Sequence, residues 1–227
     1  MDRKITAIKR QKKNPERLDI FLDGDYAFGL SRFTAAWLEI GQVLSDQKIE
    51  RLLAEDEIER AYQKSLKFLS YRVRSEKEIR KKLEESEIDA SIIDEVIARL
   101  RNKQYVKDED FARQWVESRN VFRPRGKRAL VLELRQKGID EALIQRTVDD
   151  LVDEGEMAYQ LGLRFSNRYG HLEQSDFRKK LISYLYRRGF SYETIIPIVD
   201  RIWGEVQRDK SKRFNLRDKE EKQNELT

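Results

Sequence analysis

The stretch SRNVFRPRGKRALVLELRQKGIDE, from Ser118 to Glu141, decides the fold of most of the chain. It begins with a basic connection that a proline and a glycine interrupt. An apolar pattern around Leu130 follows and indicates a short helix. Gly138 suits the left-handed residue that ends such a helix, and Asp140 can cap the next one. The stretch therefore predicts two helices joined by a tight turn.

Equivalent residues recur on both sides of this stretch at a step of 51 residues. The aligned apolar columns are Leu83, Leu134 and Leu185; Ile79, Leu130 and Leu181; Ile88, Ile139 and Phe190; and Ile93, Ile144 and Ile195. A column of cap residues, Asp89, Asp140 and Ser191, shares the same offset. Because so many columns share one step, the sequence predicts an internal repeat of three units.

Each repeat has room for three helices. We expect first helices over about 59–71, 109–121 and 156–169, second helices over about 76–86, 127–137 and 176–188, and third helices over about 90–102, 141–153 and 192–203. Pro197 lies in the last of these, so that helix should kink there or begin later, near Thr194. Glu87 occupies the turn position that is glycine in the other two repeats, where a left-handed residue other than glycine costs about 1 kcal/mol.

The residues before the repeats carry strand signals. Alternating apolar residues flank the pair Asp23-Gly24, which is a favourable hairpin turn, and two or three short antiparallel strands should form. A short helix near Phe33 should end at about Gly41. Ser45 can cap an amphipathic helix that runs toward the first repeat, and the sequence leaves open whether that helix breaks near residues 55–57.

The predicted fold is therefore mainly α-helical, with tandem three-helix repeats that form an elongated, curved rod after a small β-hairpin module. The expected divisions are a β-rich module over 1–45, a connecting helix over 46–58, repeats over 59–106, 107–154 and 155–204, and a charged tail over 205–227. Because apolar residues are sparse after about Glu205, the tail should be a frayed helix or disordered.

Composition narrows the classes of function. Charged residues make up 39% of the 227 residues, and the net charge of +5 is too small to prove a nucleic-acid partner without local clustering. The absence of cysteine excludes disulfides and thiolate metal sites and fits a reducing cytoplasm. No apolar run reaches the roughly 20 residues of a membrane span. With His171 as the only histidine and no phosphate loop or catalytic triad, we expect no metal, no cofactor and no enzyme activity.

The strongest functional signal is a basic cluster in the second repeat. Between residues 119 and 137 its basic members are Arg119, Arg123, Arg125, Lys127, Arg128, Arg135 and Lys137, opposed there only by Glu133. Around a helix N-terminus, guanidinium groups and free backbone N–H groups can bind phosphates or carboxylates. A solvated helix face is the alternative, and we favour a binding surface.

The other repeats carry weaker versions of this cluster. The first has Arg72, Arg74, Lys77, Arg80, Lys81 and Lys82 with four glutamates interleaved, and the third has Arg178, Lys179, Lys180, Arg187 and Arg188. In the first repeat, solubility explains the lysines as well as binding does. Most of the aromatic residues in the repeats lie at helical spacing, so core packing is their expected role.

These residues resemble the RecX family of bacterial recombination regulators. The resemblance lies in FLSYRVRSEKEIRKKL, YVKDEDFARQWVESR and RPRGKRALVLELRQKGID, within about 59–203. It implies a non-enzymatic protein that binds the RecA filament and single- and double-stranded DNA, and that mainly inhibits the recombinase, ATPase and coprotease activities of RecA. It places the seven basic residues of the second repeat against the filament or its DNA, with Arg72, Arg74, Lys81 and Lys82 as second-rank candidates.

Two other functions stay open at this point. The chain could be a stand-alone DNA-binding protein that contacts phosphates, in which case its affinity for bare DNA should fall steeply with salt. It could also be a repeat scaffold for another protein, with no effect on RecA and no affinity for DNA. We expect a monomer, because no long apolar stripe is left over.

Overall fold

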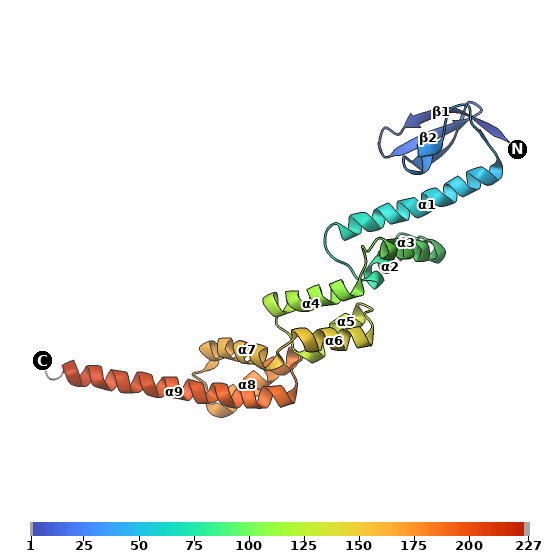
Figure 1. The fold of residues 1–227 in the computed structure, drawn as a ribbon. Helices are drawn as coiled ribbons and strands as arrows, with labels where there is room; N and C mark the ends of the chain where they lie inside the picture. The colour runs from blue at the N-terminus through green and yellow to red at the C-terminus, as the bar shows by residue number, and fades with distance from the viewer. Residues whose placement is uncertain (1, 225–227) are drawn as a thin grey trace. The chain divides into compact units, whose positions relative to one another are not determined.

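The computed structural model describes the backbone of residues 2–224 and the side chains of residues 2–212. Its contacts divide the chain into two compact units, Met1–Lys107 and Asp108–Thr227. Within the described residues, the first unit contains a β-sheet and three α-helices, and the second contains six α-helices (Figure 1). The predicted mainly α-helical fold with three three-helix repeats after a β-rich module is confirmed.

The sheet has four strands rather than the expected two or three. They are β1 (Arg3–Arg10), β2 (Arg17–Leu22), β3 (Asp25–Ser31) and β4 (Val43–Leu44), in the antiparallel order β3-β2-β1-β4. The two-residue β4 is too short to show alternation in the sequence. Asp23 and Gly24 both have positive φ, 51° and 101°, as the predicted hairpin turn requires. The expected short helix is a 3₁₀ turn, Thr34–Trp37.

Helix α1 (Asp46–Leu69) is continuous, so the break left open near residues 55–57 is absent. Ser45 caps it, as predicted, by accepting a hydrogen bond from the Lys48 backbone N–H. Its first half supplies Ile49 and Leu52 to the core of the sheet, and its second half supplies Ala61 and Tyr62 to the first repeat. One helix thereby serves both parts of the first unit.

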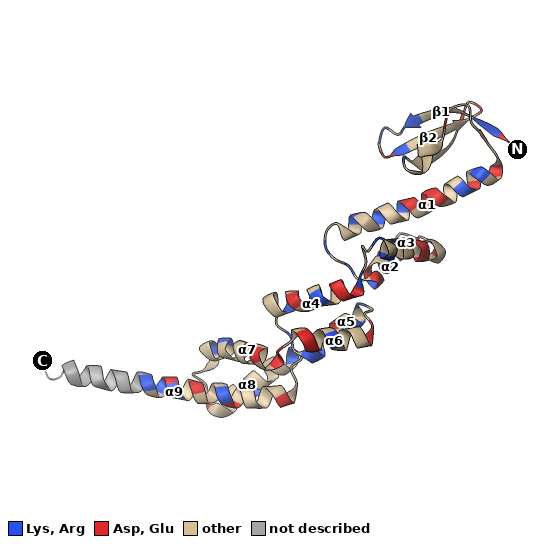
Figure 2. Ribbon diagram, in the orientation of Figure 1, with Lys and Arg blue, Asp and Glu red and all other residues tan. Residues whose placement is uncertain are grey.

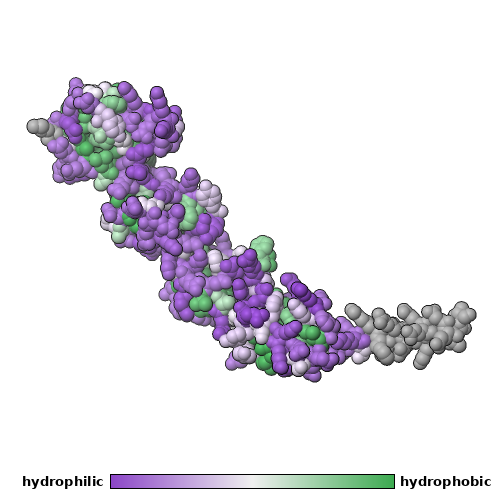
Figure 3. Space-filling model, turned by 180° about the vertical axis from the view of Figure 1, so that it is seen from behind, coloured by the Kyte–Doolittle hydropathy of each residue, from purple (hydrophilic) through white to green (hydrophobic). Residues whose placement is uncertain are grey.

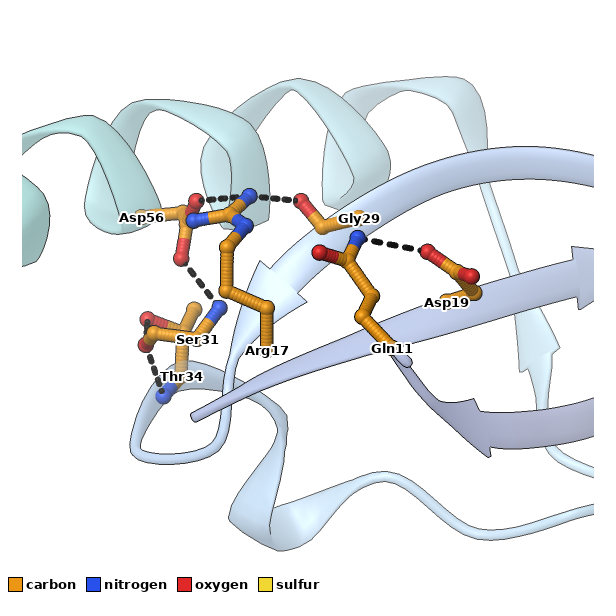
Figure 4. Close-up of polar contacts among 7 residues, drawn as sticks. All are labelled: Gln11, Arg17, Asp19, Gly29, Ser31, Thr34 and Asp56. Carbon is orange, nitrogen blue, oxygen red and sulfur yellow. Dashed lines mark hydrogen bonds and ion pairs between the residues drawn. The ribbon is translucent and has the colours of Figure 1, made fainter. Parts of the chain in front are cut away.

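A buried carboxylate joins α1 to the sheet. Asp56, which is 3% exposed, accepts hydrogen bonds from the Arg17 guanidinium at 3.0 Å and the Ser31 backbone N–H at 2.5 Å (Figure 4). Arg17 also donates to the Gly29 carbonyl oxygen, so its charge is held between β3 and α1. A buried carboxylate is stable only when its oxygens are paired in this way, and the pairing fixes where the sheet lies on the helix.

The repeats follow the predicted three-helix pattern. The first uses α1, α2 (Glu76–Glu84) and α3 (Ala90–Asn102); the second uses α4 (Asp108–Phe122), α5 (Lys127–Gln136) and α6 (Glu141–Leu151); the third uses α7 (Glu154–Tyr169), α8 (Gln174–Arg187) and α9 (Tyr192–Asn224). Each second helix buries the two apolar columns of the repeat: Ile79 and Leu83, Leu130 and Leu134, Leu181 and Leu185 are all 0% exposed.

The turn after each second helix contains a residue with left-handed backbone geometry. The φ angles are 58° at Glu87, 82° at Gly138 and 89° at Gly189. In every repeat the next residue's N–H donates to the carbonyl of the buried leucine, as from Ile88 to Leu83, which is the bond of a Schellman motif. The prediction that Glu87 bears this strained geometry is confirmed.

The column of predicted caps is only partly correct. Asp140 accepts from two backbone N–H groups and Ser191 accepts from that of Thr194, whereas the side chain of Asp89 makes no cap hydrogen bond. Ser75 and Glu78 instead form the complete capping box that starts the second helix of the first repeat.

Helix α9 differs most from expectation. It begins at Tyr192 rather than near Thr194 and contains Pro197, because Ser191 and its hydrogen bonds already fix the first turn. Of the two alternatives expected for the tail after about Glu205, a frayed helix or disorder, the backbone through Asn224 is helical. Residues 225–227 of that tail lie outside the described residues.

The surface agrees with the charged composition. The face drawn in Figure 3 is dominated by hydrophilic residues, with scattered apolar groups. Among the helices that the structure describes, none is long and apolar enough to cross a membrane.

Replacing Glu87 by glycine should stabilise the first unit. Glycine adopts positive φ without the Cβ clash, so Glu87→Gly should raise the free energy of unfolding by about 1 kcal/mol. Urea titration followed by circular dichroism measures this change. The control is Glu95→Gly, an exposed position inside α3, which should lower the free energy by about 1 kcal/mol. A lower stability for Glu87→Gly would contradict the strain at this turn.

Candidate partner interface

The basic cluster predicted in the second repeat spans the end of α4, the connection after it and the whole of α5. Helices α4 to α6 carry basic and acidic residues side by side (Figure 2). The fold therefore brings acidic groups from outside the stretch 119–137 against the cluster, and the contrast of seven bases with one acid seen in the sequence does not survive folding.

Glu133 neutralises one side of the cluster. Its carboxylate lies 2.7 Å from the Arg119 guanidinium and 3.9 Å from that of Arg125. The same carboxylate accepts a hydrogen bond from the Trp115 indole N–H at 2.8 Å. Arg119 and Lys137 also lie over the Trp115 ring, at 4.4 and 5.0 Å from its centre. These residues form a local network around a half-buried tryptophan.

Two further basic residues are paired with acids that the sequence pattern did not connect to them. The Lys127 ammonium lies 2.6 Å from Asp149 of α6. The Arg135 guanidinium makes bidentate hydrogen bonds to the carboxylate of Glu141, the first residue of α6, at 2.8 to 3.0 Å. Hydrogen bonds from Arg135, and next from Gln145, lower the pKa of the Glu141 carboxyl below its ordinary value.

Arg123 and Arg128 form the accessible part of the cluster. Both are exposed, and among the described residues neither has an acidic partner within ion-pair distance. Arg128 lies 5.1 Å from the ring centre of Tyr186 on α8, and lines an open groove of about 650 Å³ with Lys127, Arg135 and Arg187. Three of the predicted residues thus meet in one groove, joined by an α8 arginine of the third repeat.

The N-terminus of α5 is already occupied by a carboxylate of the chain itself. Glu154, at the start of α7, accepts a hydrogen bond from the Lys127 backbone N–H at 2.9 Å. Its other oxygen accepts from the hydroxyl groups of Ser191 and Thr194, at 3.2 and 2.9 Å. The sequence predicted that backbone N–H groups at this helix start are free to bind a phosphate. That prediction is corrected, because the carboxylate of Glu154 already lies there.

The second-rank residues of the first repeat form no comparable surface. Arg72 pairs with Glu78 at 2.8 Å, and Lys82 lies 3.3 Å from Glu85. Arg74 stacks on Phe68, 3.9 Å from the ring centre, and burial lowers the pKa of its guanidinium. Lys81 is exposed on α2.

The sequence missed Glu141, Asp149 and Glu154 as partners of the cluster. Counting acids over residues 119–141 instead of 119–137 would have included Glu141. The other two lie 22 and 27 residues from Lys127, so only the three-helix packing identifies them. Most aromatic residues of the second and third repeats pack in or against the cores, as expected, but Phe122 is 80% exposed beside Arg123.

Four family models match the β-rich module and the three repeats. The Regulatory protein RecX N-terminal domain matches residues 3–45, and the first, second and third three-helix domains of RecX match residues 61–100, 108–148 and 153–198. Regulatory protein RecX of Bacillus subtilis (strain 168) is 33% identical over 212 residues, which cover 92% of this chain and 80% of the relative. Regulatory protein RecX of Listeria monocytogenes EGD-e is 32% identical over 194 residues, which cover 84% of this chain and 72% of the relative.

Two crystal structures share the fold. One of regulatory protein RecX is 30% identical with a TM-score of 0.72, covering 87% of this chain and 99% of that one. One of RecX from Lactobacillus salivarius is 28% identical with a TM-score of 0.59, covering 67% of this chain and 98% of that one.

Removing the Glu154 carboxylate should loosen the second unit. Glu154→Ala leaves three donors without their acceptor, and we expect the free energy of unfolding to fall by about 1–3 kcal/mol. Glu154→Gln should lose less, because one amide oxygen can accept from Lys127 and the amide nitrogen can donate to a hydroxyl. Urea titration measures the change, with exposed Glu156→Ala as the control. Equal stability of Glu154→Ala and the unchanged protein would show that this carboxylate does not join the repeats.

The carboxyl of Glu141 should titrate below its ordinary pKa, and Arg135→Gln should raise that pKa. A carboxyl whose pKa is lower in the folded state stabilises the fold above its unfolded pKa, and this contribution is lost as pH falls through the folded pKa. The contribution of this exposed pair is small, so the test is a carbon-detected NMR titration of the carboxyl. No change in the pKa on removing Arg135 would contradict the assigned cause.

Proposed function

The chain belongs to the RecX family of regulatory proteins, and on this premise we propose that it binds the RecA recombinase filament and mainly inhibits its recombinase, ATPase and coprotease activities. The observation that carries the proposal is the groove between α5 and α8, where Arg128 and Arg187 of two neighbouring repeats face solvent without acidic partners in the described residues. Such a groove suits an acidic surface of a protein filament or the phosphates of its DNA.

Inhibition of this kind needs binding and no chemistry. The second and third repeats, which lie in one compact unit, present several weak contacts together, and contacts that need no rearrangement add up to appreciable affinity. Glu154 and the backbone contacts around Gly126 fix α5 relative to the third repeat, so the arginines are held in place before binding. The relatives are named regulatory proteins, which agrees with a role without catalysis.

The second candidate is a stand-alone DNA-binding protein. It shares the basic residues but not the dependence on RecA. A protein that acts only through phosphates should bind bare DNA with strong salt dependence and should slow any enzyme that competes for that DNA. RecA-specific inhibition at substoichiometric ratios separates the two functions.

The test is DNA-dependent ATP hydrolysis by a preformed RecA filament, titrated with the full chain. The variant replaces Arg123, Arg125 and Arg128 with glutamate, since these three have the weakest pairing with acids inside the protein. We expect the unchanged protein to inhibit well below one molecule per RecA, and the variant to need at least about tenfold more.

A matched control reverses three exposed lysines of α1, Lys48, Lys64 and Lys67, and so changes the net charge by the same amount. Circular dichroism checks that both variants stay folded. Full inhibition by a folded Arg123/Arg125/Arg128 variant would show that the surface contacting RecA lies elsewhere on the chain. Equal losses in variant and control would show that only net charge matters.

A further inference from the structure

The third repeat contains a second open groove. The sequence alone did not single it out, because the basic cluster of the second repeat ranked first. The groove lies between α7 and α8 and has a volume of about 630 Å³. Its charged lining is entirely basic: Arg164 and Arg168 come from α7, and Lys179, Lys180 and Arg187 come from α8. Figure 2 shows the matching polarity of α7, with acidic residues at its beginning and basic residues toward its end.

The charge in this groove is not neutralised by the protein. Within the described residues, none of the five basic side chains has an acidic partner at ion-pair distance, and all five are exposed. In the second repeat, by contrast, Lys127 and Arg135 pair at 2.6 and 2.8 Å. Positive charge without internal partners attracts anions more strongly, so the third repeat is the better anion-binding surface.

Aromatic rings hold several of these cations in place. Arg168 and Lys180 lie 5.4 and 5.6 Å from the ring centre of Tyr169, and Arg188, beside the groove, lies 4.7 Å from that of Tyr184. Phe165 packs against both tyrosine rings, at 4.5 and 5.3 Å between ring centres. A cation–π contact restricts a long side chain without cancelling its charge. The half-buried rings thus position cations for a ligand, and are themselves too covered to be the main stacking surface for bases.

The spacing of the cations fits a ligand with repeated negative charge. Arg164 and Arg168 are one helical turn apart, about 6 Å along α7, and Lys180 and Arg187 are two turns apart, about 10 Å along α8. Two rows of cations on facing helices can contact successive charges of a polyanion, whereas a single carboxylate would need only one of them. Ser183 of α8 also lines the groove and adds a hydroxyl donor for a phosphate oxygen.

We propose that the α7–α8 groove binds the phosphodiester backbone of a nucleic acid without reading its sequence. This inference rests on the proposed function and deepens it. It assigns the contact with DNA to the third repeat and not to the basic cluster of the second. Arg187 lines both grooves, so the backbone held by α7 and α8 would lead toward the α5–α8 groove proposed to face the filament.

The test is fluorescence anisotropy with a labelled single-stranded oligonucleotide and with the matching duplex, without RecA. The variant replaces Arg164, Arg168 and Lys179 with glutamine and keeps Arg187, which both grooves share. We expect the affinity of the full chain for at least one of the two DNA forms to fall at least about tenfold. For that form the slope of log affinity against log salt should decrease by about 2 to 3, because each phosphate contact contributes about 0.7 for a single strand and 0.9 for a duplex. The form that responds identifies the ligand.

The control replaces Lys48, Lys64 and Lys67 of α1 with glutamine, which removes the same charge from another surface. Circular dichroism must show that both variants are folded. Unchanged affinity of the groove variant for both DNA forms, or an equal loss in the control, would overturn the proposal. Lost RecA inhibition with unchanged DNA affinity would also overturn it and would assign the groove to an acidic protein surface. A failure of the proposed function is distinguishable, because the unchanged protein would then not inhibit RecA whatever its affinity for DNA.

Discussion

The three repeats depend on a chain reversal that occurs after the second helix of each. The residue there is left-handed, and the following N–H donates to the carbonyl of a leucine that is itself 0% exposed: Ile88 to Leu83, Ile139 to Leu134 and Phe190 to Leu185. One residue thus supplies both the carbonyl that closes the turn and the side chain at the centre of the core. Moving the turn by one position would rotate the third helix out of the core, which explains why the apolar columns and the turn share one 51-residue step.

In the third repeat the same reversal also joins two repeats through their backbones. The Gly126 N–H donates to the Arg188 carbonyl at 2.9 Å, and a Cβ on Gly126 would lie 2.3 Å from the Gly189 carbonyl oxygen. Glycine at both positions therefore permits the approach, and the Glu154 carboxylate reinforces it by accepting from the Lys127 N–H and the Ser191 hydroxyl. The backbone contact places α5 beside α8, and the Arg188 guanidinium, which donates to the Pro124 carbonyl at 3.3 Å, is the charged side chain that adds to it. Arg128 and Arg187, which are exposed and have no acidic partner within the described residues, remain available for a partner.

The sequence predicted what depends on neighbours along the chain and missed what depends on packing. The hairpin at Asp23, the repeat step and the strained Glu87 follow from local geometry and periodicity, and all were found. Whether α1 would break near residue 56 could not be predicted, because a buried Asp56 looks like any polar residue until Arg17 is seen to reach it from the sheet. The sequence also named only Glu133 as an acid opposing the cluster, because the carboxylates of Asp149 and Glu154 reach the cluster only through the packing of the helices. The contact surface itself stays a prediction.

Positive charge that a protein can offer to a partner is what remains after its own acids have been paired. A count along the sequence ranks the second repeat first, with seven basic residues, but Glu133, Glu141 and Asp149 hold four of them. The α7–α8 groove has fewer bases and keeps them all unpaired within the described residues. An external anion that binds those four residues must displace an internal carboxylate, whereas one that binds the α7–α8 groove displaces only water and salt ions. The cost of binding is therefore lower in the third repeat, even though its sequence signal is weaker.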